Sequence, residues 1–258
     1  GGIENALWDI VGKSKGVPVY KLFDGPVRKE LPLYWSHCGT SRVRAWDAIK
    51  KPRIKTRDDV IAFGKEVRDS GFKAIKTNIG ILGDEPYVYM PGFFKSPGDR
   101  DGHVSAGILS GIEAWVSALR EAVGKDVAIA LDLNFNFNAG ACITIGKTLE
   151  QYNLAWFEID LYDPKALRTV RDAIQTPITS CENILGLSNY RPYFDAGSMD
   201  VTSVDIIWNG FRESVEIAKE AGTRGMEVVP HNYNGHLSTM ISAHWAAVLE
   251  NVKIMEYD

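Results

Sequence analysis

The sequence predicts an α/β barrel in which eight parallel strands alternate with helices. Short apolar runs typical of buried strands recur along the chain, segments of helical periodicity separate them, and three of the runs end in a carboxylate. Strands that alternate with helices form a parallel sheet, and eight such units close into a barrel. The alternative is an open, doubly wound sheet, but no Gly-x-Gly-x-x-Gly fingerprint follows any of the runs.

The elements are assigned from periodicity and from the residues that end helices. A first helix is expected over residues 3–15, where Gly16 and Pro18 end it. Thr56 can cap a helix that runs to about Ser70 and ends at Gly71. Further helices are expected over residues 109–123, 164–174, 188–196, 212–222 and 237–249. The eight strand candidates are residues 31–35, 72–75, 127–131, 155–158, 178–182, 204–207, 227–231 and 252–256.

The segment from Gly80 to Gly107 has no periodicity and is rich in Gly, Pro and aromatic residues. A segment of this length inside a compact domain is usually a functional lid or a partly disordered loop. We expect it to supply part of a lid, with apolar cover from Tyr87, Tyr89, Phe93 and Phe94.

Composition narrows the class of protein. The chain has 258 residues, enough for one large barrel or two small domains, and 45% of them are hydrophobic. A formal net charge of −4 argues against general binding to nucleic acid or to anionic membranes. No run of 18 apolar residues predicts a transmembrane helix, and the N-terminal residues have the pattern of an amphipathic helix rather than of a signal peptide. Three scattered cysteines (Cys38, Cys142 and Cys181) fit the reducing cytoplasm.

Three acidic residues stand where apolar runs stop. Asp132, Glu158 and Glu182 are separated by 26 and 24 residues, about the length of one strand–helix repeat. If their strands are neighbours, the three carboxylates point toward one place, and a cation would be needed to keep them ionised. Hard carboxylate oxygens suit Mg²⁺. The alternative is three unrelated helix N-caps, because Asp is common at such positions.

Other polar residues occupy the remaining strand ends, which is where barrel enzymes place their reactive groups. The candidates are Lys76 and Asn78 after the second strand, Asn134 after the third, Asp205 in the sixth, His231 in the seventh and Glu256 in the eighth. His37 and His236 lie in loops at the same predicted face, and both are candidate substrate contacts. Trp208 follows Asp205 and either lines the pocket or packs in the barrel.

With these residues in order, the chain resembles the enolase superfamily, specifically its mandelate racemase and muconate lactonizing enzyme group. The resemblance runs from the helix at residues 3–13 to residues 254–256. It implies a modified (β/α)7β TIM barrel over residues 31–258. Residues 1–30 are then expected to be a linker helix leading from the family's α+β capping domain, and we expect that domain to be missing from this sequence. Homo-oligomers are also expected from the resemblance.

The resemblance also assigns roles to the strand-end residues. It implies Asp132, Glu158 and Glu182 as Mg²⁺ ligands and His231 with Asp205 as the catalytic dyad. Glu256 corresponds to a residue that contacts the substrate in some members. Lys76 is expected to contact the substrate carboxylate or to tune a neighbouring pKa, and Asn78, Asn134, His236 and His37 complete the candidate substrate contacts.

The second strand departs from the family's pattern. Many members carry Lys-x-Lys there, whereas this chain has Lys76-Thr-Asn78, and asparagine cannot act as a base. Racemisation needs bases on both faces of the substrate, but dehydration needs only one catalytic pair. The sequence therefore predicts a Mg²⁺-dependent dehydratase, a lyase that converts a sugar acid to a 2-keto-3-deoxy acid through an enediolate. The alternatives are a racemase, epimerase or cycloisomerase of a carboxylate substrate, or a catalytically impaired metal-binding barrel.

Overall fold

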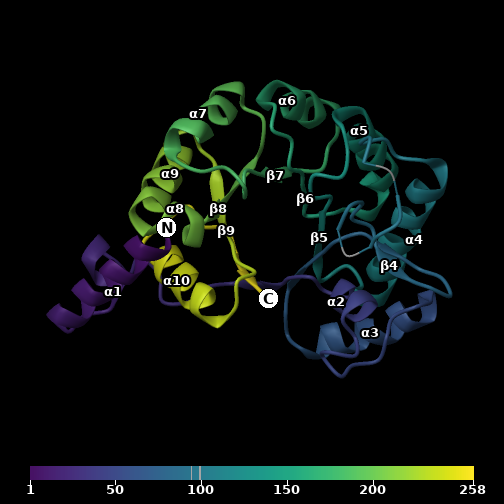
Figure 1. Ribbon diagram of the computed structural model, residues 1–258, viewed down its shortest axis with the longest axis horizontal. Coiled ribbons are helices and arrows are strands. Elements are labelled where there is room, and N and C mark those ends of the chain that lie inside the picture. Colours follow the sequence, from purple (N-terminus) through teal and green to yellow (C-terminus); the bar gives the residue numbers. More distant parts are fainter. Residues whose placement is uncertain (94, 99) are drawn as a thin grey trace. The chain divides into compact units, whose positions relative to one another are not determined.

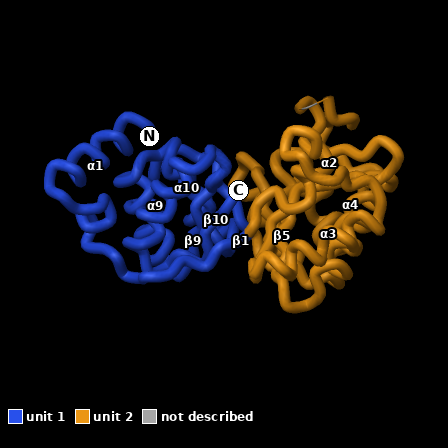
Figure 2. The backbone as a smooth tube through the Cα atoms, turned by 90° about the horizontal axis from the view of Figure 1, so that it is seen from below, with its two compact units in different colours: residues 1–34, 179–258 blue, residues 35–178 orange. Residues whose placement is uncertain are grey.

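The computed structural model describes residues 1–93, 95–98 and 100–258. It divides into two compact units, which Figure 2 draws in different colours. Unit 1 comprises residues 1–34 and 179–258, and unit 2 comprises residues 35–178. In each unit, parallel strands carry helices along one side (Figure 1).

Unit 2 contains strands that run in the order β1-β2-β5-β6, all parallel. They are β1 (Leu33–Trp35, which pairs through Trp35), β2 (Ala74–Thr77), β5 (Ala128–Asp132) and β6 (Trp156–Glu158). The accompanying helices are α2 (Thr40–Arg44), α3 (Arg57–Asp69), α4 (Ala106–Val123), α5 (Ala139–Leu149) and α6 (Pro164–Ala173), with a 3₁₀ turn, η2 (Glu150–Tyr152). The register places Asp132 directly beside Glu158 at the carboxyl ends of their strands.

The helices of unit 2 begin where the sequence supplies caps. Thr56 and Asp59 form a reciprocal capping box at α3, and Asp163 accepts hydrogen bonds from the first turn of α6. Helices α3 and α4 then pack closely, because Gly64 faces Ala122 with no room for a Cβ atom. The fully buried Trp115 of α4 donates from Nε1 to Thr77 Oγ1 at 3.2 Å and so ties the helix layer to the end of β2.

Unit 1 contains parallel strands in the order β7-β8-β9: β7 (Ile178–Ser180), β8 (Val201–Asp205) and β9 (Glu227–His231). Strand β10 (Met255–Tyr257) ends the chain, and Met255 N donates to Pro32 O at 2.9 Å. The accompanying helices are α1 (Gly2–Lys15), η1 (Val19–Phe23), α7 (Leu187–Ala196), α8 (Ile206–Asn209), α9 (Phe211–Thr223) and α10 (His236–Ala246). Helix α1 lies against α8 and α9, where Asn5 Nδ2 donates to Ile206 O at 3.0 Å (Figure 1).

Several elements differ from the sequence assignment. The strand expected at residues 204–207 occupies Val201–Asp205, because the Asp205 side chain accepts a hydrogen bond from Trp208 N and starts α8 in place of a longer strand. Helix α5 was not expected; Asn138 caps it by accepting from Ala141 N at 3.0 Å. The short helix α2 was also missed.

The segment over residues 80–107 is more ordered than its composition indicates. It begins with a two-stranded antiparallel sheet, β3 (Gly80–Ile81) and β4 (Tyr87–Val88). Beyond β4, Tyr89 stacks on Phe137 with ring centroids 5.6 Å apart, and Phe93 packs edge-on against Phe135. Phe94, expected to share in the apolar cover, lies outside the described residues. The segment is therefore anchored on the loop that follows β5.

None of the helices in the described parts of the chain is both long and apolar enough to cross a membrane.

The cap of α6 gives a test of this local structure. Asp163 Oδ1 accepts from Lys165 N at 2.8 Å and from Ala166 N at 3.3 Å. Asp163→Ala should lower the free energy of unfolding by about 1 kcal/mol, because two backbone donors lose their partner. The matched control is Asp172→Ala, which removes an exposed ion pair with Arg168 in the same helix and should leave the free energy of unfolding close to that of the wild type. Urea denaturation measures both, and equal losses would contradict the assignment of the cap.

Candidate active site

In unit 2, four of the predicted residues form a buried polar group at the carboxyl ends of β2, β5 and β6. Lys76 Nζ donates to Glu158 Oε2 at 2.7 Å, and both side chains are almost fully buried. Asn78 Nδ2 donates to Asp132 Oδ2 at 2.9 Å. The strand register explains part of this grouping, because Asp132 pairs with Glu158 and Lys76 with Ala130. Asn78 follows the end of β2, two residues after Lys76.

The Asp132 carboxyl is the electrostatically strained member of this group. Burial, and after it the negative charge of Glu158, raise its pKa to about 6, although Lys76, the Asn134 backbone N–H and His37 act in the opposite direction. The half-buried His37 is thus close enough to Asp132 to affect its charge. These influences leave a carboxyl group whose ionised form would be stabilised by additional positive charge.

Asn78 and Asn134 both donate hydrogen bonds to the Asp132 carboxylate. Asn134 adopts a left-handed backbone conformation, φ 51°, which aims both its backbone N–H and its side-chain amide at the Asp132 carboxylate, at 2.7 and 2.9 Å. Asn78 Nδ2 also lies 3.4 Å from Asn134 Oδ1. The structure therefore brings both predicted substrate contacts to the acidic group and orients them on its central carboxylate.

In unit 1, the histidine and its two carboxylates form a second buried group. The register of β8 and β9 pairs Asp205 with His231, and His231 Nδ1 lies 2.8 Å from Asp205 Oδ2. On the other side of the ring, Nε2 lies 3.4 Å from Glu182 Oε2. Asp205 is fully buried, and its carboxylate holds the imidazole ring through Nδ1. The ring is thereby held between two carboxylates.

Glu256 is buried beside this group. Its Oε2 accepts from Asn232 N at 2.7 Å, while the Asn232 side chain donates to Glu256 O at 3.0 Å and to Thr239 Oγ1 at 3.0 Å. Sequence reasoning overlooked Asn232, although its position directly after His231 was a usable signal. His236 is exposed at the first residue of α10.

Two aromatic side chains flank His231. The Trp208 and Tyr233 rings lie 5.4 and 5.1 Å from the His231 ring and 6.4 Å from each other. They are 36% and 47% exposed, so each presents one part to His231 and another to solvent. Trp208 is therefore part of the histidine's surroundings and not of a closed core. Tyr233, two residues after His231, was not singled out in the sequence.

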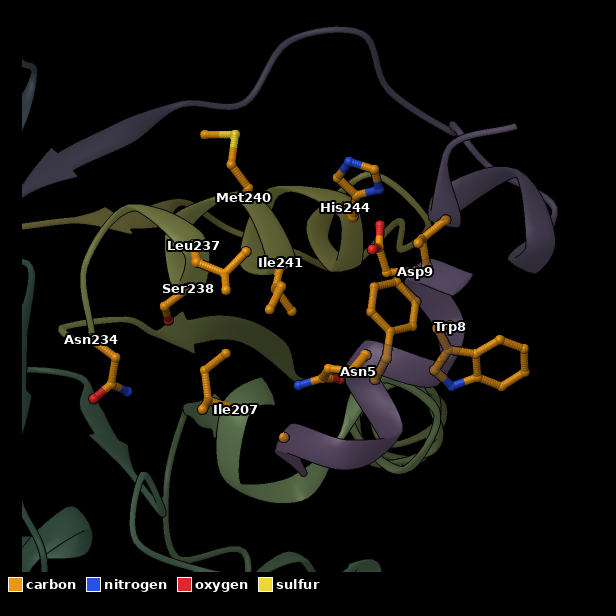
Figure 3. A pocket seen from close by; sticks show the side chains of 14 residues that line it. Asn5, Trp8, Asp9, Ile207, Asn234, Leu237, Ser238, Met240, Ile241 and His244 are labelled. Carbon is orange, nitrogen blue, oxygen red and sulfur yellow. The ribbon is translucent and has the colours of Figure 1, made fainter. Parts of the chain in front are cut away.

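A separate apolar hollow of about 420 Å³ lies between α1 and α10 in unit 1 (Figure 3). Asn5 and Trp8 of α1 and Leu237 and Ile241 of α10 are among its lining residues. His244 also lines it, and burial lowers the pKa of that imidazole. None of the residues predicted for the site lines this hollow, so it is distinct from the histidine group.

The resemblance implies Mg²⁺, a hard cation that prefers carboxylate oxygens as ligands. Asp132 and Glu158 supply adjacent, buried, hard oxygen donors, and the raised pKa of Asp132 shows that more positive charge would be accommodated there. These two residues fit a divalent cation. Across the described ranges no three His, Cys, Asp or Glu side chains form a complete metal-holding group. The trio of Asp132, Glu158 and Glu182 therefore stays a prediction.

Comparison with known proteins decides the family. Residues 59–258 match the family described as Enolase C-terminal domain-like, which is more than half of the chain. The chain belongs to this family. As an Enolase C-terminal domain-like protein, it has the α/β barrel fold class that the sequence predicts. A crystal structure from Burkholderia xenovorans supports this with a TM-score of 0.94, 42% identity and coverage of 99% of this chain and 65% of that one.

The named relatives of this family member carry out more than one reaction. The chain is 28% identical to arabinonate dehydratase of Saccharolobus solfataricus, over 97% of its own length and 58% of the relative's. It is also 28% identical to D-xylonate dehydratase of Haloferax volcanii, over 99% and 58%. The Burkholderia xenovorans protein is provisionally described as an L-alanine-DL-glutamate epimerase, and a second crystal structure of it contains magnesium and fumarate. The chain thus spans a little over half the length of its curated relatives.

The raised pKa of Asp132 gives a pH-dependent prediction for protein kept metal-free with a chelator. Between its ordinary pKa of 3.8 and about 6, folded Asp132 holds a proton that the unfolded chain has released, so folding stability falls as the pH rises through this window. Asp132→Asn lacks this loss. The free energy of unfolding of the variant minus that of the wild type should therefore rise by on the order of 2 kcal/mol between pH 4 and pH 7.

Any hydrogen bonds lost in Asp132→Asn change the free energy of unfolding of the variant by the same amount at pH 4 and at pH 7. The change in the difference between variant and wild type across this pH range therefore reports the titration of Asp132. Asp126→Asn, which alters an exposed carboxyl just before β5, is the control. A difference between wild type and Asp132→Asn that stays constant across the pH range, measured by urea denaturation, would contradict the proposed burial of charge.

Proposed function

We propose that this chain is the catalytic part of a Mg²⁺-dependent dehydratase that acts on a sugar acid, an aldonate or aldarate. The observation that carries the proposal is an asymmetry of acid–base groups. Unit 1 has one complete histidine–aspartate pair at 2.8 Å, whereas an asparagine follows β2 where an opposed base would be required for racemisation. The sugar-acid dehydratases among the relatives favour the same reaction class.

His231 would act as both base and acid. With Nδ1 held by Asp205, its Nε2 is the position that takes the proton from the carbon next to the substrate carboxylate. The imidazolium, stabilised by the buried Asp205 charge, then returns a proton to the departing β-hydroxyl. Loss of water from the enediolate gives an enol, and its tautomer is the 2-keto-3-deoxy acid.

Asn78 supports dehydration over racemisation. Its amide donates to Asp132, and neither its nitrogen nor its oxygen can accept a proton at neutral pH. Lys76 is held by Glu158 at 2.7 Å, so its ammonium is oriented toward the acidic group. We assign Lys76 to the reaction as a fixed positive charge near the substrate carboxylate.

We propose Asp132, Glu158 and Glu182 as the ligands of Mg²⁺. When bound, Mg²⁺ would supply positive charge to offset the negative charge that develops on the substrate carboxylate. Asn134, Glu256, His37 and His236 are proposed to contact the substrate. The presence of magnesium and fumarate in the Burkholderia xenovorans structure supports a metal and a carboxylate for this chain.

The remaining proposals concern organisation. We assign residues 31–258 to the catalytic barrel and residues 1–30 to the segment that leads into it. The protein is proposed to act in the cytoplasm as a homo-oligomer, without nucleic acid or membrane partners, in keeping with its scattered cysteines and its charge of −4.

An epimerase is the second candidate, favoured by the 42% identity to the Burkholderia xenovorans protein. Cycloisomerisation is represented by D-galactarolactone cycloisomerase of Agrobacterium fabrum, 26% identical over 89% of the chain. An epimerase would need Lys76 to leave Glu158 and act as the opposed base. Such an enzyme would exchange the substrate α-hydrogen with solvent deuterium in both configurations and form no 2-keto product.

The proposed reaction is tested with a library of sugar acids. Purified protein with Mg²⁺ should convert at least one aldonate or aldarate to a product that reacts with semicarbazide, because a 2-keto-3-deoxy acid carries a free ketone. Chelated enzyme is the control. A library without any 2-keto product, together with α-hydrogen exchange in D₂O, would replace the dehydratase proposal with the epimerase.

The role of His231 gives a second test. His231→Asn should lower kcat by at least about 100-fold, since the group that moves the proton is lost. Mn²⁺ affinity measured by electron paramagnetic resonance should stay close to the wild-type value. His244→Asn, in α10 and outside the histidine group, is the matched control and should retain turnover. Full activity in His231→Asn would eliminate the dyad as the acid–base pair.

A further inference from the structure

We infer that Asn209 is a positioning residue. It fixes the loop between β7 and α7, residues 181–186 (the Glu182 loop), relative to Asp205. The inference rests on the proposed function, because it gives Asn209 the task of holding a proposed metal ligand beside the proposed base. Asn209 ends α8, four residues after Asp205, and its side chain is only partly exposed.

Asn209 uses its whole amide on backbone groups from two loops. Its Oδ1 accepts from Gly186 N at 2.8 Å, and its Nδ2 donates to Ile184 O at 3.2 Å and to Asp205 O at 3.1 Å. The orientation of the amide is unambiguous, because the Gly186 N–H requires an oxygen and the two carbonyls require a donor. One side chain thus joins the segment after β7 to the end of β8.

These contacts complete a closed circuit of interactions that includes His231, its two carboxylates and Asn209. Glu182 and Asp205 contact opposite nitrogens of the imidazole, at 3.4 and 2.8 Å. Asn209 connects the backbone segments that carry the two carboxylates. The two carboxylates are therefore linked twice, through the His231 ring and through Asn209.

The Glu182 loop needs such support because it begins in a strained conformation. Cys181 has φ 84°, a left-handed conformation that residues other than Gly rarely adopt. The hydroxyl of the fully buried Tyr190 lies 3.0 Å from Cys181 O and 3.2 Å from Ser203 O. Glu213 Oε1 accepts from Leu187 N at 2.8 Å. Asn209 is the contact among these that also reaches Asp205.

The experiment compares Asn209→Ala with Asn251→Ala. Asn251 is a matched control, since its partly buried Nδ2 also bridges two backbone carbonyls of unit 1, those of Ala218 and Met226, but it does not touch the Glu182 loop. Asn209→Ser keeps one hydrogen-bonding group, should fall between the wild type and Asn209→Ala, and carries the test if Asn209→Ala does not fold. Two readouts are used: Mn²⁺ affinity by electron paramagnetic resonance and amide hydrogen exchange of residues 183–187.

Asn209→Ala should weaken Mn²⁺ binding about tenfold or more, because groups that orient a metal ligand have effects of this size. Exchange at Gly186 and Leu187 should accelerate, whereas Asn251→Ala should change neither readout. Wild-type exchange in Asn209→Ala would overturn the inference, as would unchanged Mn²⁺ affinity. If the wild-type protein itself binds no Mn²⁺, the proposed metal site is wrong and Asn209 is left with a structural role only, which the exchange rates still reveal.

Discussion

The buried carboxylate of Asp205 is the interaction on which the arrangement of unit 1 depends. One oxygen accepts from Trp208 N and starts α8, and the other holds His231 Nδ1 at 2.8 Å. Its carbonyl accepts from Asn209. A fully buried charge is tolerated only when its acceptor positions are filled, and here the groups that fill them are those that turn the chain and orient the base.

Unit 2 also contains buried carboxylates, but there the hydrogen-bond donors and the lysine do not fully compensate for their burial and mutual repulsion. Asp132 and Glu158 are neighbours on parallel strands, and the register of the strands fixes their backbones side by side. Lys76 binds Glu158, and two asparagines donate to Asp132, yet burial and the neighbouring charge still raise the pKa of Asp132. Amide dipoles therefore only partly replace a cation, which is the physical reason for assigning a metal to these oxygens.

Much of the fold was predictable because strand ends carry a strong signal. The strand at residues 227–231 matches β9 residue for residue, and the pairing of Asp205 with His231 follows from placing both residues at neighbouring strand ends. The error at residues 204–207 arose because Ile206 and Ile207 prolong the apolar run, while periodicity in so short a segment does not distinguish a strand from a buried helical turn.

Other parts could not be predicted because their reasons are tertiary. Helix α5 contains Gly140, Gly146 and several β-branched residues, all weak helix formers. Gly146 is required by the close approach of Ile174, a contact that is invisible in the sequence. Asn209 and Tyr233 were overlooked for a similar reason, since a polar or aromatic residue after a strand has the composition of any loop until its partners are known.

Three of the seven non-glycine residues with positive φ in the described parts of the chain lie beside the candidate chemistry. His37, Asn134 and Cys181 all have positive φ without being glycine, and each lies shortly after a strand that carries or precedes a proposed site residue. Asn134 uses this conformation to bring two donors to Asp132, and Cys181 uses it to begin the Glu182 loop. Such conformations persist only where surrounding contacts over-determine them. Around Cys181, the Tyr190 hydroxyl holds the backbone carbonyl. Around Asn134, the hydrogen bonds to Asp132 both hold the strained residue and set the direction of that carboxylate. At Asn134, strain and site geometry are therefore maintained by the same hydrogen bonds, and a substitution that relaxes one should disturb the other.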